Sequence, residues 1–290
     1  MIIVITGPTG VGKTKMSVEL AKRLNAEIIN GDSMQVYTGL DIATAKIKEE
    51  EKDGIPHHLF DIVNPTYDYT VYDYQKDCRK KIEEISSRGK NIIIVGGTGL
   101  YIKAALYNYN FNKETTKYDF SNKTNSELYD EIKSNNEDIN IHVNNRKRLE
   151  RELTKIYNNT TSDGKGSEIL YPFTIIGLTT DRNNLYERIN ERVDKMVKDG
   201  LIEESKRLYD NKIHSKAVNT GIGYKELYQY FDGKITLDES LDLIKKNSRH
   251  YAKRQYTFFN NQFNMNWFEV NYEAFNKTIE EVHNFITKEE

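Results

Sequence analysis

The stretch MIIVITGPTGVGKT, residues 1–14, decides the fold. Its first part, Ile2–Ile5, is a short apolar run rich in β-branched residues that ends at a glycine turn, which is typical of a fully buried parallel strand. Its second part, Gly7–Thr14, fits the pattern G-x-x-x-x-G-K-[ST], and a helical pattern begins at Lys13. A strand, this loop and a helix in succession indicate a phosphate-binding loop.

The chemistry of polyphosphate binding explains these residue types. Glycines let backbone N–H groups close around phosphate oxygens, the helix N-terminus adds its positive dipole end, and Lys13 supplies a point charge. Thr14 offers a hydroxyl suited to a Mg²⁺ ion carried by the phosphates. Loops of this kind serve kinases, hydrolases and a few transferases, so the reaction stays open at this point. The predicted phosphate-binding residues are Gly7, Pro8, Thr9, Gly10, Val11, Gly12, Lys13 and Thr14.

Size and composition predict a soluble protein with one large domain or two unequal ones. The chain has 290 residues, of which 30% are charged and 37% hydrophobic, and its net charge is −2. A nucleic-acid site must therefore be a local basic patch. One cysteine, Cys78, excludes an internal disulfide and indicates a reducing compartment. Apolar runs fall short of the roughly 18 residues of a membrane span, and the N-terminus lacks a leader pattern, so we expect a cytoplasmic location and no membrane partner.

Further strands and helices alternate along the chain, which predicts an α/β fold with a parallel sheet flanked by helices, as in P-loop NTPases. Asp32 directly follows the second strand, and ligands of such sheets lie at the carboxyl ends of the strands. We therefore expect Asp32 beside the phosphate loop. The strands after the first are expected at 27–30, 59–63, 92–95 and 173–178.

Two short motifs allow alternative interpretations. The turn Gly96-Gly97-Thr98-Gly99 follows a buried strand, and its glycines either bring the backbone close to a ligand or serve only to turn the chain. The pair His57-His58 suggests a metal site, but no nearby cysteine or carboxylate completes a ligand set, which favours loop structure or substrate contact.

Residues 111–171 differ in amino-acid composition from the rest of the chain. This difference predicts a smaller, all-helical insertion domain that contacts RNA. Residues 1–110 and 172–290 would then form the core domain. Polar residues dominate the insertion, and Lys147, Arg151 and Lys155 form a basic stripe on its last helix. Such a stripe is either a solvated face or a contact to phosphate groups.

Two further helices carry basic side chains toward the same sheet edge. Arg188 and Arg192 lie one turn apart on one of them, where they either reach solvent or a phosphate site. A second helix opens with the capping box Thr236–Glu239 and carries five basic residues interleaved with aromatics. This pattern suits a nucleic-acid strand, although a helix that buries its aromatics is the commoner case. The five basic residues are Lys245, Lys246, Arg249, Lys253 and Arg254.

A phosphoryl-transfer kinase is one chemical interpretation of these features. Kinases of this type hold Mg²⁺ with an aspartate at the end of a second long apolar strand, whereas the strand at 92–95 ends in glycine. Asp32 could nonetheless accept a proton from a hydroxyl group, so this interpretation stays open.

Seven motifs in this order resemble the tRNA dimethylallyltransferases, and the sequence is similar to the bacterial members. The resemblance covers most of the chain, is most specific in DSMQVY, GGTGLY and GYKE, and is weakest at 113–171. The motifs are GPTGVGKT, INGDSMQVYTGLDIATAK, HHLFDI, GGTGLYIKA, ERINERVDKMVKDGL, GIGYKELYQYFDG and YAKRQ.

The resemblance implies transfer of the dimethylallyl group of dimethylallyl diphosphate to N6 of the adenosine 3′-adjacent to the anticodon, in tRNAs that read U-initial codons. It implies Mg²⁺ at Thr14 and a catalytic set of Asp32, Lys13, Thr9 and Arg192, with Asp32 taking the proton of the amine. A monomer is expected because no coiled-coil pattern appears. Free adenine nucleotides are an alternative acceptor, and a nucleotide or small-molecule kinase is the alternative enzyme. Contacts to the tRNA anticodon stem-loop are expected from Asp32, Ser33, Met34, Gln35, Thr98, Arg146, Arg148, Lys253, Arg254 and Gln255.

Some positions depart from the pattern that the family usually shows, and all are expected on the RNA-facing side. They put tRNA affinity or tRNA choice in question and leave the diphosphate chemistry intact. The departures are Ser121, Thr220, Gly221, His250, Phe258 and Asn260.

Overall fold

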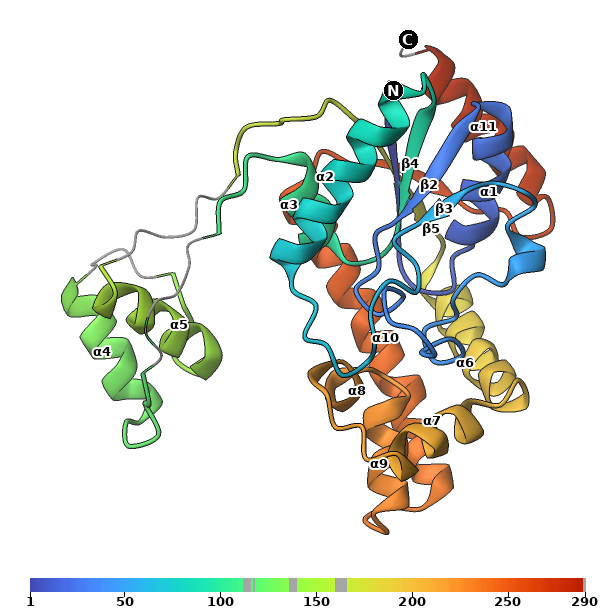
Figure 1. Ribbon diagram of the computed structural model, residues 1–290. Coiled ribbons are helices and arrows are strands. Elements are labelled where there is room, and N and C mark those ends of the chain that lie inside the picture. The colour runs from blue at the N-terminus through green and yellow to red at the C-terminus, as the bar shows by residue number, and fades with distance from the viewer. Residues whose placement is uncertain (112–115, 117, 136–139, 160–165, 289–290) are drawn as a thin grey trace. The chain divides into compact units, whose positions relative to one another are not determined.

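The computed structural model describes residues 1–111, 116, 118–135, 140–159 and 166–288 (Figure 1). The chain divides into two compact units, one formed by Met1–Leu106 with Tyr171–Glu290 and the other by Tyr107–Leu170. We call them the core unit and the insertion unit. The sequence predicted the insertion at 111–171, so its bounds lie at slightly earlier residues at both ends.

A parallel six-stranded sheet in the order β3-β2-β4-β1-β5-β6 forms the centre of the core unit. The phosphate loop therefore leaves a central strand, between β4 and β5. This architecture confirms the expected α/β fold. The strands are β1 (Ile2–Thr6), β2 (Ala26–Asn30), β3 (His57–His58), β4 (Asn91–Val95), β5 (Thr174–Thr179) and β6 (Asn266–Glu269).

The sequence predicted a strand at residues 59–63, and this prediction is wrong. The edge strand is the two-residue β3, and Leu59 and Asp61 adopt left-handed φ values of 63° and 54°, which a β ladder does not accommodate. Val63 forms only an isolated bridge with Tyr37. The backbone N–H groups of residues 61–63 donate to the carbonyls of Gln35 and Val36, which lie in a loop, so the apolar run forms a bent connection instead of a strand.

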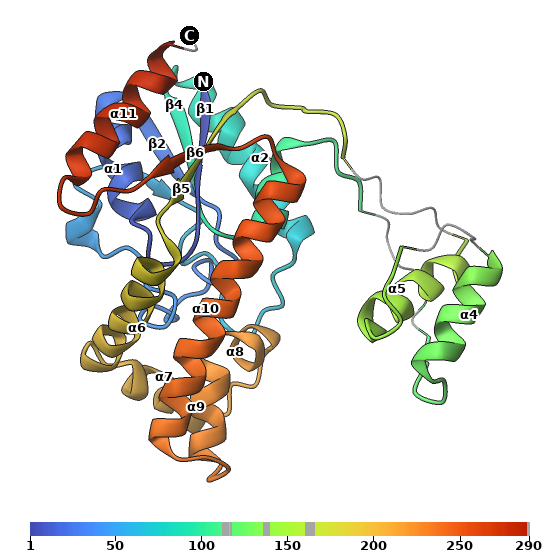
Figure 2. The same cartoon turned by 180° about the vertical axis from the view of Figure 1, so that it is seen from behind.

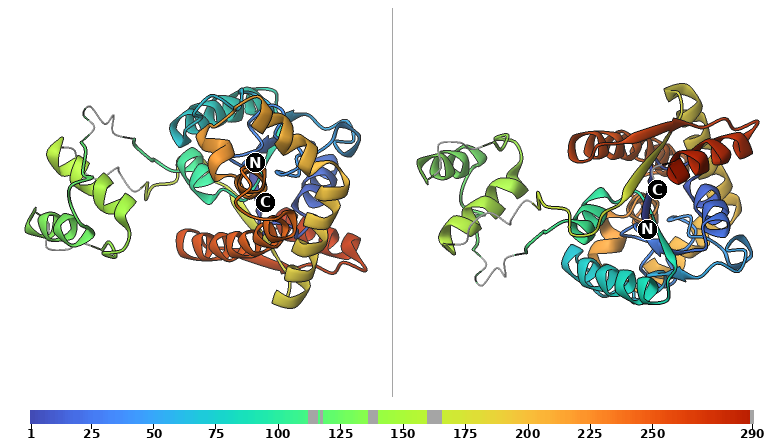
Figure 3. Two further views of the ribbon diagram at one scale, coloured as in Figure 1. Left: turned by 90° about the horizontal axis from the view of Figure 1, so that it is seen from below. Right: turned by 90° about the horizontal axis from the view of Figure 1, so that it is seen from above.

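Helices cover both faces of the sheet (Figures 1 and 3). On one face α1 and α11 pack over Ile3, Ile5 and Ile28, and on the other face lie α2 and α3. The buried strand residues alternate between the two layers, as strand geometry requires. These helices are α1 (Lys13–Arg23), α2 (Val71–Ser87), α3 (Gly99–Leu106) and α11 (Phe275–Lys288).

The remaining helices of the core unit gather beyond the carboxyl ends of the strands, while both chain ends lie at the opposite edge (Figure 2). The predicted capping box is present, because Thr236 Oγ1 accepts from the Glu239 N–H and Glu239 Oε2 accepts from the Thr236 N–H. The helices are α6 (Arg182–Lys198), α7 (Leu201–Asp210), α8 (Lys216–Thr220), α9 (Tyr224–Phe231) and α10 (Leu237–Gln262), and a 3₁₀ turn, η1 (Glu49–Glu51), precedes β3.

The insertion unit contains α4 (Asn125–Asn135) and α5 (Arg146–Tyr157). The helices bury a small apolar cluster, and an antiparallel bridge joins Tyr107 to Ile169 near the unit's two ends. None of the helices in the described part of the chain combines the length and apolar character that a membrane crossing requires. The cluster consists of Phe120, Leu128, Ile132, Leu149 and Leu153.

Candidate active site

The phosphate loop folds around two glycines whose backbone conformations other residues rarely adopt. Gly7 has φ 141°, and a Cβ there would lie 2.4 Å from the carbonyl oxygen of Leu178. Gly12 has φ 99° and caps α1 without a side chain, so the first N–H groups of that helix face the loop. The loop thus presents backbone donors and a helix N-terminus to the same point, as an anion site requires.

Lys13 lies at the start of α1 and folds back over the loop. Its Nζ donates hydrogen bonds to the carbonyl oxygens of Gly7 (3.0 Å) and Pro8 (2.8 Å). The pKa of Lys13 is lowered to about 7, mainly by burial of the amine and then by the nearby charge of Arg192, while the carboxylate of Asp32 acts in the opposite direction. A phosphate anion would reverse this shift by favouring the protonated amine.

Arg192 on α6 reaches the same place. Burial lowers the pKa of Arg192 from its usual value, and the nearby carboxylate of Asp32 acts in the opposite direction. Arg188, one turn earlier, contacts the carbonyl of Gly10 (3.4 Å) and stacks over the ring of Tyr272 (3.8 Å to the centroid). The arginine pair that the sequence singled out therefore splits, with one side chain in the site and the other supporting the loop from outside.

Asp32 follows β2 and lies within electrostatic reach of Lys13 and Arg192, as predicted. A tight turn fixes its backbone: the Asp32 N–H donates to Asn30 Oδ1 (2.8 Å), and Asp32 Oδ1 accepts from the Met34 N–H (2.8 Å). Asn30 is fully buried and also donates to the carbonyl of Leu59 (3.0 Å). Sequence reasoning missed Asn30 because nothing distinguishes a buried asparagine from an ordinary strand end.

The glycine turn after β4 approaches neighbouring protein segments. A Cβ on Gly96 would lie 2.2 Å from the backbone of Gly31, and one on Gly97 would lie 1.9 Å from Gln255 Nε2. Thr98 joins this turn to the segment after β2, because its Oγ1 accepts from the Ser33 N–H (3.0 Å). Close packing of the chain on itself therefore explains these glycines.

Gln255 on α10 connects the two glycine-rich turns. Its Oε1 accepts from the N–H of Thr9 (3.0 Å) and its Nε2 donates to the carbonyl of Gly97 (3.1 Å), and the residue is only 4% exposed. Both ends of the amide are thus used inside the protein. Its predicted contact to RNA stays a prediction, while its bridging role is visible in the structure.

These elements surround a cavity of about 320 Å³ within the core unit. One part of its lining is polar and contains most of the predicted site residues, namely Thr9, Gly10, Lys13, Thr14, Asp32, Ser33, Met34, Gln35, Arg192, Arg254 and Gln255. The other part is apolar and includes Ile189, Val193, Met196, Leu201, Ile222 and Ile244. Ile189, Val193 and Met196 recur at helical spacing, which by itself indicates only helix packing. The cavity is therefore lined both by residues of the phosphate loop and by apolar side chains.

Other predicted RNA contacts are not among the residues that line this cavity. Lys253 is exposed on α10, and Arg148 is exposed on α5 of the insertion unit. Arg146 supports the insertion unit itself, since its guanidinium donates to the carbonyls of Lys123 (2.8 Å) and Phe120 (2.7 Å). The structure thus gives Arg146 an internal role, and its contact to RNA stays a prediction.

The two histidines form separate contacts. His58 Nε2 lies 2.6 Å from Glu27 Oε2, which also accepts from Arg88 (2.7 Å), and His57 Nδ1 lies 2.7 Å from the carbonyl of Ile55. Within the described residues, no three His, Cys, Asp or Glu side chains form a group that could hold a metal ion.

The departures from the family pattern divide into three groups. Thr220 and Gly221 line the cavity, while Ser121 and His250 are exposed. Phe258 packs against Gly99, where a Cβ would lie 2.2 Å from its ring, and Asn260 Oδ1 accepts from Trp267 Nε1 (2.9 Å). Phe258 and Asn260 thus form contacts with other residues of the core unit.

Comparisons with known proteins agree with this geometry. The sequence pattern of the IPP transferase family matches residues 35–262. The chain is 46% identical over 298 residues to the tRNA dimethylallyltransferase of Anoxybacillus flavithermus, an alignment that covers 98% of this chain and 96% of that protein.

Two solved structures resemble the fold. The full-length tRNA isopentenylpyrophosphate transferase from Bacillus halodurans superposes with a TM-score of 0.78 at 45% identity, covering 99% of this chain and 95% of that one. A eukaryotic dimethylallyltransferase acting on tRNA gives a TM-score of 0.78 at 29% identity, covering 92% of this chain and 73% of that one.

Proposed function

Because the chain belongs to the IPP transferase family, we propose that it transfers the dimethylallyl group of dimethylallyl diphosphate to tRNA, at N6 of the adenosine 3′-adjacent to the anticodon. The observation that carries this proposal is the cavity of the core unit. Its lining includes phosphate-loop residues with Lys13, the charged groups of Arg192 and Asp32, and apolar side chains. A diphosphate ester of a short hydrocarbon matches both parts.

The reaction exchanges a carbon–oxygen bond for a carbon–nitrogen bond. The N6 lone pair attacks C1 of the allyl group, the C1–O bond breaks, and diphosphate leaves with the bonding electrons. One N6 proton passes to the carboxylate of Asp32, which is held in place by its turn and can act as general base. The amine is a poor nucleophile because its lone pair is delocalised, so removal of this proton assists the attack.

Stabilisation of the departing diphosphate lowers the barrier, because positive charge develops on the allyl carbon while negative charge develops on the leaving group. Lys13, Arg192 and the loop amides from Gly7 to Thr14 would bind that anion, and Thr9, held by Gln255, would contact it. Mg²⁺ would neutralise part of the same charge. The Thr14 hydroxyl is the one protein ligand proposed for it, which fits an ion whose other ligands come from the diphosphate and water.

The acceptor base must leave its stack to reach such a cavity. Ser33, Met34 and Gln35 line it next to Asp32 and would surround the adenine, while Arg254 at the cavity and Lys253 on the same helix would contact phosphates. We further propose that tRNAs reading U-initial codons are the substrates and that the enzyme works as a cytoplasmic monomer.

Incubation with labelled dimethylallyl diphosphate, Mg²⁺ and unmodified tRNA tests the proposal. We expect label in tRNA at the anticodon-adjacent adenosine and none in AMP supplied as a competing acceptor. Absence of label in tRNA with a folded enzyme would end the proposal. Label in AMP would instead identify an enzyme for free nucleotides, and ATP consumption without prenyl transfer would identify a kinase.

A second experiment tests the role of Asp32. The Asp32→Ala variant should retain diphosphate binding, because the phosphate loop is untouched, but lose turnover by about a hundredfold or more. Equilibrium binding and single-turnover rates measure the two effects separately. Turnover close to that of the unchanged enzyme would remove Asp32 from the base role.

A further inference from the structure

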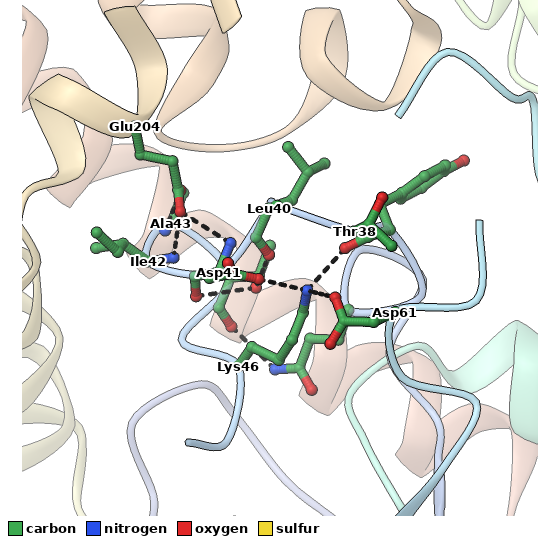
Figure 4. Close-up of polar contacts among 12 residues, drawn as sticks. Thr38, Leu40, Asp41, Ile42, Ala43, Lys46, Asp61 and Glu204 are labelled. Carbon is green, nitrogen blue, oxygen red and sulfur yellow. Dashed lines mark hydrogen bonds and ion pairs between the residues drawn. The ribbon is translucent and has the colours of Figure 1, made fainter. Parts of the chain in front are cut away.

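Residues 41–46, which we call the wall segment, form an irregular turn whose backbone donors converge on one carboxylate. That carboxylate belongs to Glu204 on α7, which is 7% exposed and points directly at the turn (Figure 4). The donors are the N–H groups of Asp41 (2.9 Å), Ile42 (2.8 Å) and Ala43 (3.2 Å) and the hydroxyl of Tyr224 (2.7 Å).

The far end of the wall segment is anchored as well. Lys46 Nζ donates to the carbonyl of Tyr37 (2.7 Å) and pairs with Asp41 (2.6 Å) and Asp61, and its side chain is only 5% exposed (Figure 4). Gln35 Nε2 donates to the carbonyl of Thr44 (3.0 Å). Two backbone hydrogen bonds close the turn within the wall segment, from the Ala45 N–H to Ile42 and from the Lys46 N–H to Asp41 (both 2.9 Å). Side chains attach this turn to the rest of the core unit, and among them Glu204 accepts from the most backbone groups.

The wall segment bounds the apolar part of the cavity. Residues 43–45 line the cavity, and Ile42 and Ala43 pack against the cluster that contains Val193, Leu201 and Ile244. Ala43 lies so close to Gly223 that a Cβ on that glycine would be 3.0 Å from the Ala43 methyl group. A shift of the wall segment would therefore change the volume open to a hydrocarbon chain.

We propose that Glu204 is a positioning residue that holds the wall segment against the allyl chain of the donor and thereby sets the preference for the short dimethylallyl group. The inference rests on the proposed function, since it takes a prenyl diphosphate as the donor. Glu204 touches neither the cavity nor the reacting atoms and acts through the backbone of Asp41, Ile42 and Ala43.

Glu204→Gln tests this role with almost no change in side-chain volume. A carboxylate accepts at both oxygens, whereas an amide accepts at only one. In Glu204→Gln, the amide oxygen can still serve Asp41 and Ile42, and the Tyr224 hydroxyl can turn to accept from the amide nitrogen. Only the Ala43 N–H then loses its acceptor, so the segment loosens at the residue that lines the cavity.

The readout is the ratio of kcat/KM for geranyl diphosphate, one isoprene unit longer, to kcat/KM for dimethylallyl diphosphate with the same tRNA. A pocket discriminates a methylene group by roughly ten- to two-hundredfold, so we expect the ratio to rise about tenfold in Glu204→Gln. Tyr224→Phe removes one of the four hydrogen bonds and should raise the ratio about threefold. Glu203→Gln, one residue earlier on the exposed side of α7, should leave the ratio unchanged.

Loss of folded enzyme lowers activity with both donors equally and leaves the ratio constant, so the ratio separates positioning from stability. An unchanged ratio in Glu204→Gln, with the unchanged enzyme active on dimethylallyl diphosphate, overturns the inference. If Glu204→Gln does not fold, Tyr224→Phe decides by the same criterion. If the unchanged enzyme transfers neither donor, the proposed function itself fails.

Discussion

The two glycine-rich turns at the carboxyl edge of the sheet look alike in sequence but need glycine for different reasons. In the loop after β1, Gly7 and Gly12 are closely packed and also adopt φ values of 141° and 99°, which side-chain-bearing residues rarely reach. In the turn after β4, Gly96 and Gly97 lack left-handed φ values, and the backbone of Gly31 or the amide of Gln255 takes the place of a Cβ. The first turn thus requires glycine for its backbone conformation as well as for packing, and the second for packing alone.

This comparison predicts that changes in the first turn act mainly on catalysis and changes in the second on stability. Lys13→Ala removes the point charge from the first turn and should lower kcat/KM by about a hundred- to a thousandfold, the usual range for an electrostatic group at a developing anion. The thermal midpoint should change little. Steady-state rates and a melting curve measure the two effects.

Lys15→Ala is the matched control for Lys13→Ala, because Lys15 is an exposed cation two residues further along α1. Its activity should stay within about twofold of the unchanged enzyme, since the charge lies outside the cavity and surface charges are worth little. A loss in Lys13→Ala that is no greater than in Lys15→Ala would contradict a role for Lys13 at the diphosphate.

Gly96→Ala tests the second turn. The new Cβ would meet the Gly31 backbone at 2.2 Å, and backbone cannot move aside as a side-chain tip can, so we expect destabilisation by about 3 kcal/mol, at the upper end for overpacking. Denaturant unfolding measures it. Gly54→Ala is the control for dihedral strain alone, because Gly54 has φ 75° and open space around it, and should cost only about 1 kcal/mol. Equal costs would show that close packing is not what requires Gly96.

Gln255→Ala tests the link between the turns. It leaves the Thr9 N–H and the Gly97 carbonyl without their partner in a buried place, which costs about 1–3 kcal/mol. Because Thr9 belongs to the phosphate loop, kcat should fall as well, by about tenfold. The comparison variant is Gln262→Ala on the same helix, whose hydrogen bond to Lys103 is exposed and whose loss should cost less than about 0.5 kcal/mol. Full activity in Gln255→Ala would mean that the loop keeps its shape without the link.

The sequence could predict those parts of the fold and site that depend on local pattern. β1, β2 and β4 are β-branched runs beside glycine or asparagine. The loop that ends at Lys13 follows β1, and Asp32 lies two residues after β2, so chain connectivity alone brings them to one edge. β6, which reads Asn-Trp-Phe-Glu, was missed because neither alternation nor a β-branched run marks it, and its place is set by pairing with β5.

The parts that the sequence could not predict depend on partners distant in the chain. Gln255 belongs to a basic, aromatic helix, and only the fold shows that its amide reaches Thr9 and Gly97. Glu204 is one of two adjacent glutamates, and sequence does not distinguish the exposed one from the one that holds Asp41, Ile42 and Ala43. Side chains that stabilise irregular backbone have no periodic signature, because the backbone that they serve has none.

The smallest expected effect concerns pH, and it separates the first turn from the second because only the first holds a titrating lysine. With the pKa of Lys13 at about 7, the amine is about half protonated at pH 7 and mostly neutral at pH 8, and only the protonated form favours an anion. Rising pH should therefore weaken diphosphate binding by about fivefold between these values, beyond the ligand's own titration. The effect of the ligand's own titration is measured with Lys13→Arg, since its guanidinium stays charged over this pH range. Calorimetry at pH 8 in two buffers of different ionisation enthalpy measures how many protons are taken up when diphosphate binds. The unchanged enzyme should take up nearly one proton more than Lys13→Arg. Equal uptake by both would mean that Lys13 is already protonated before the anion arrives.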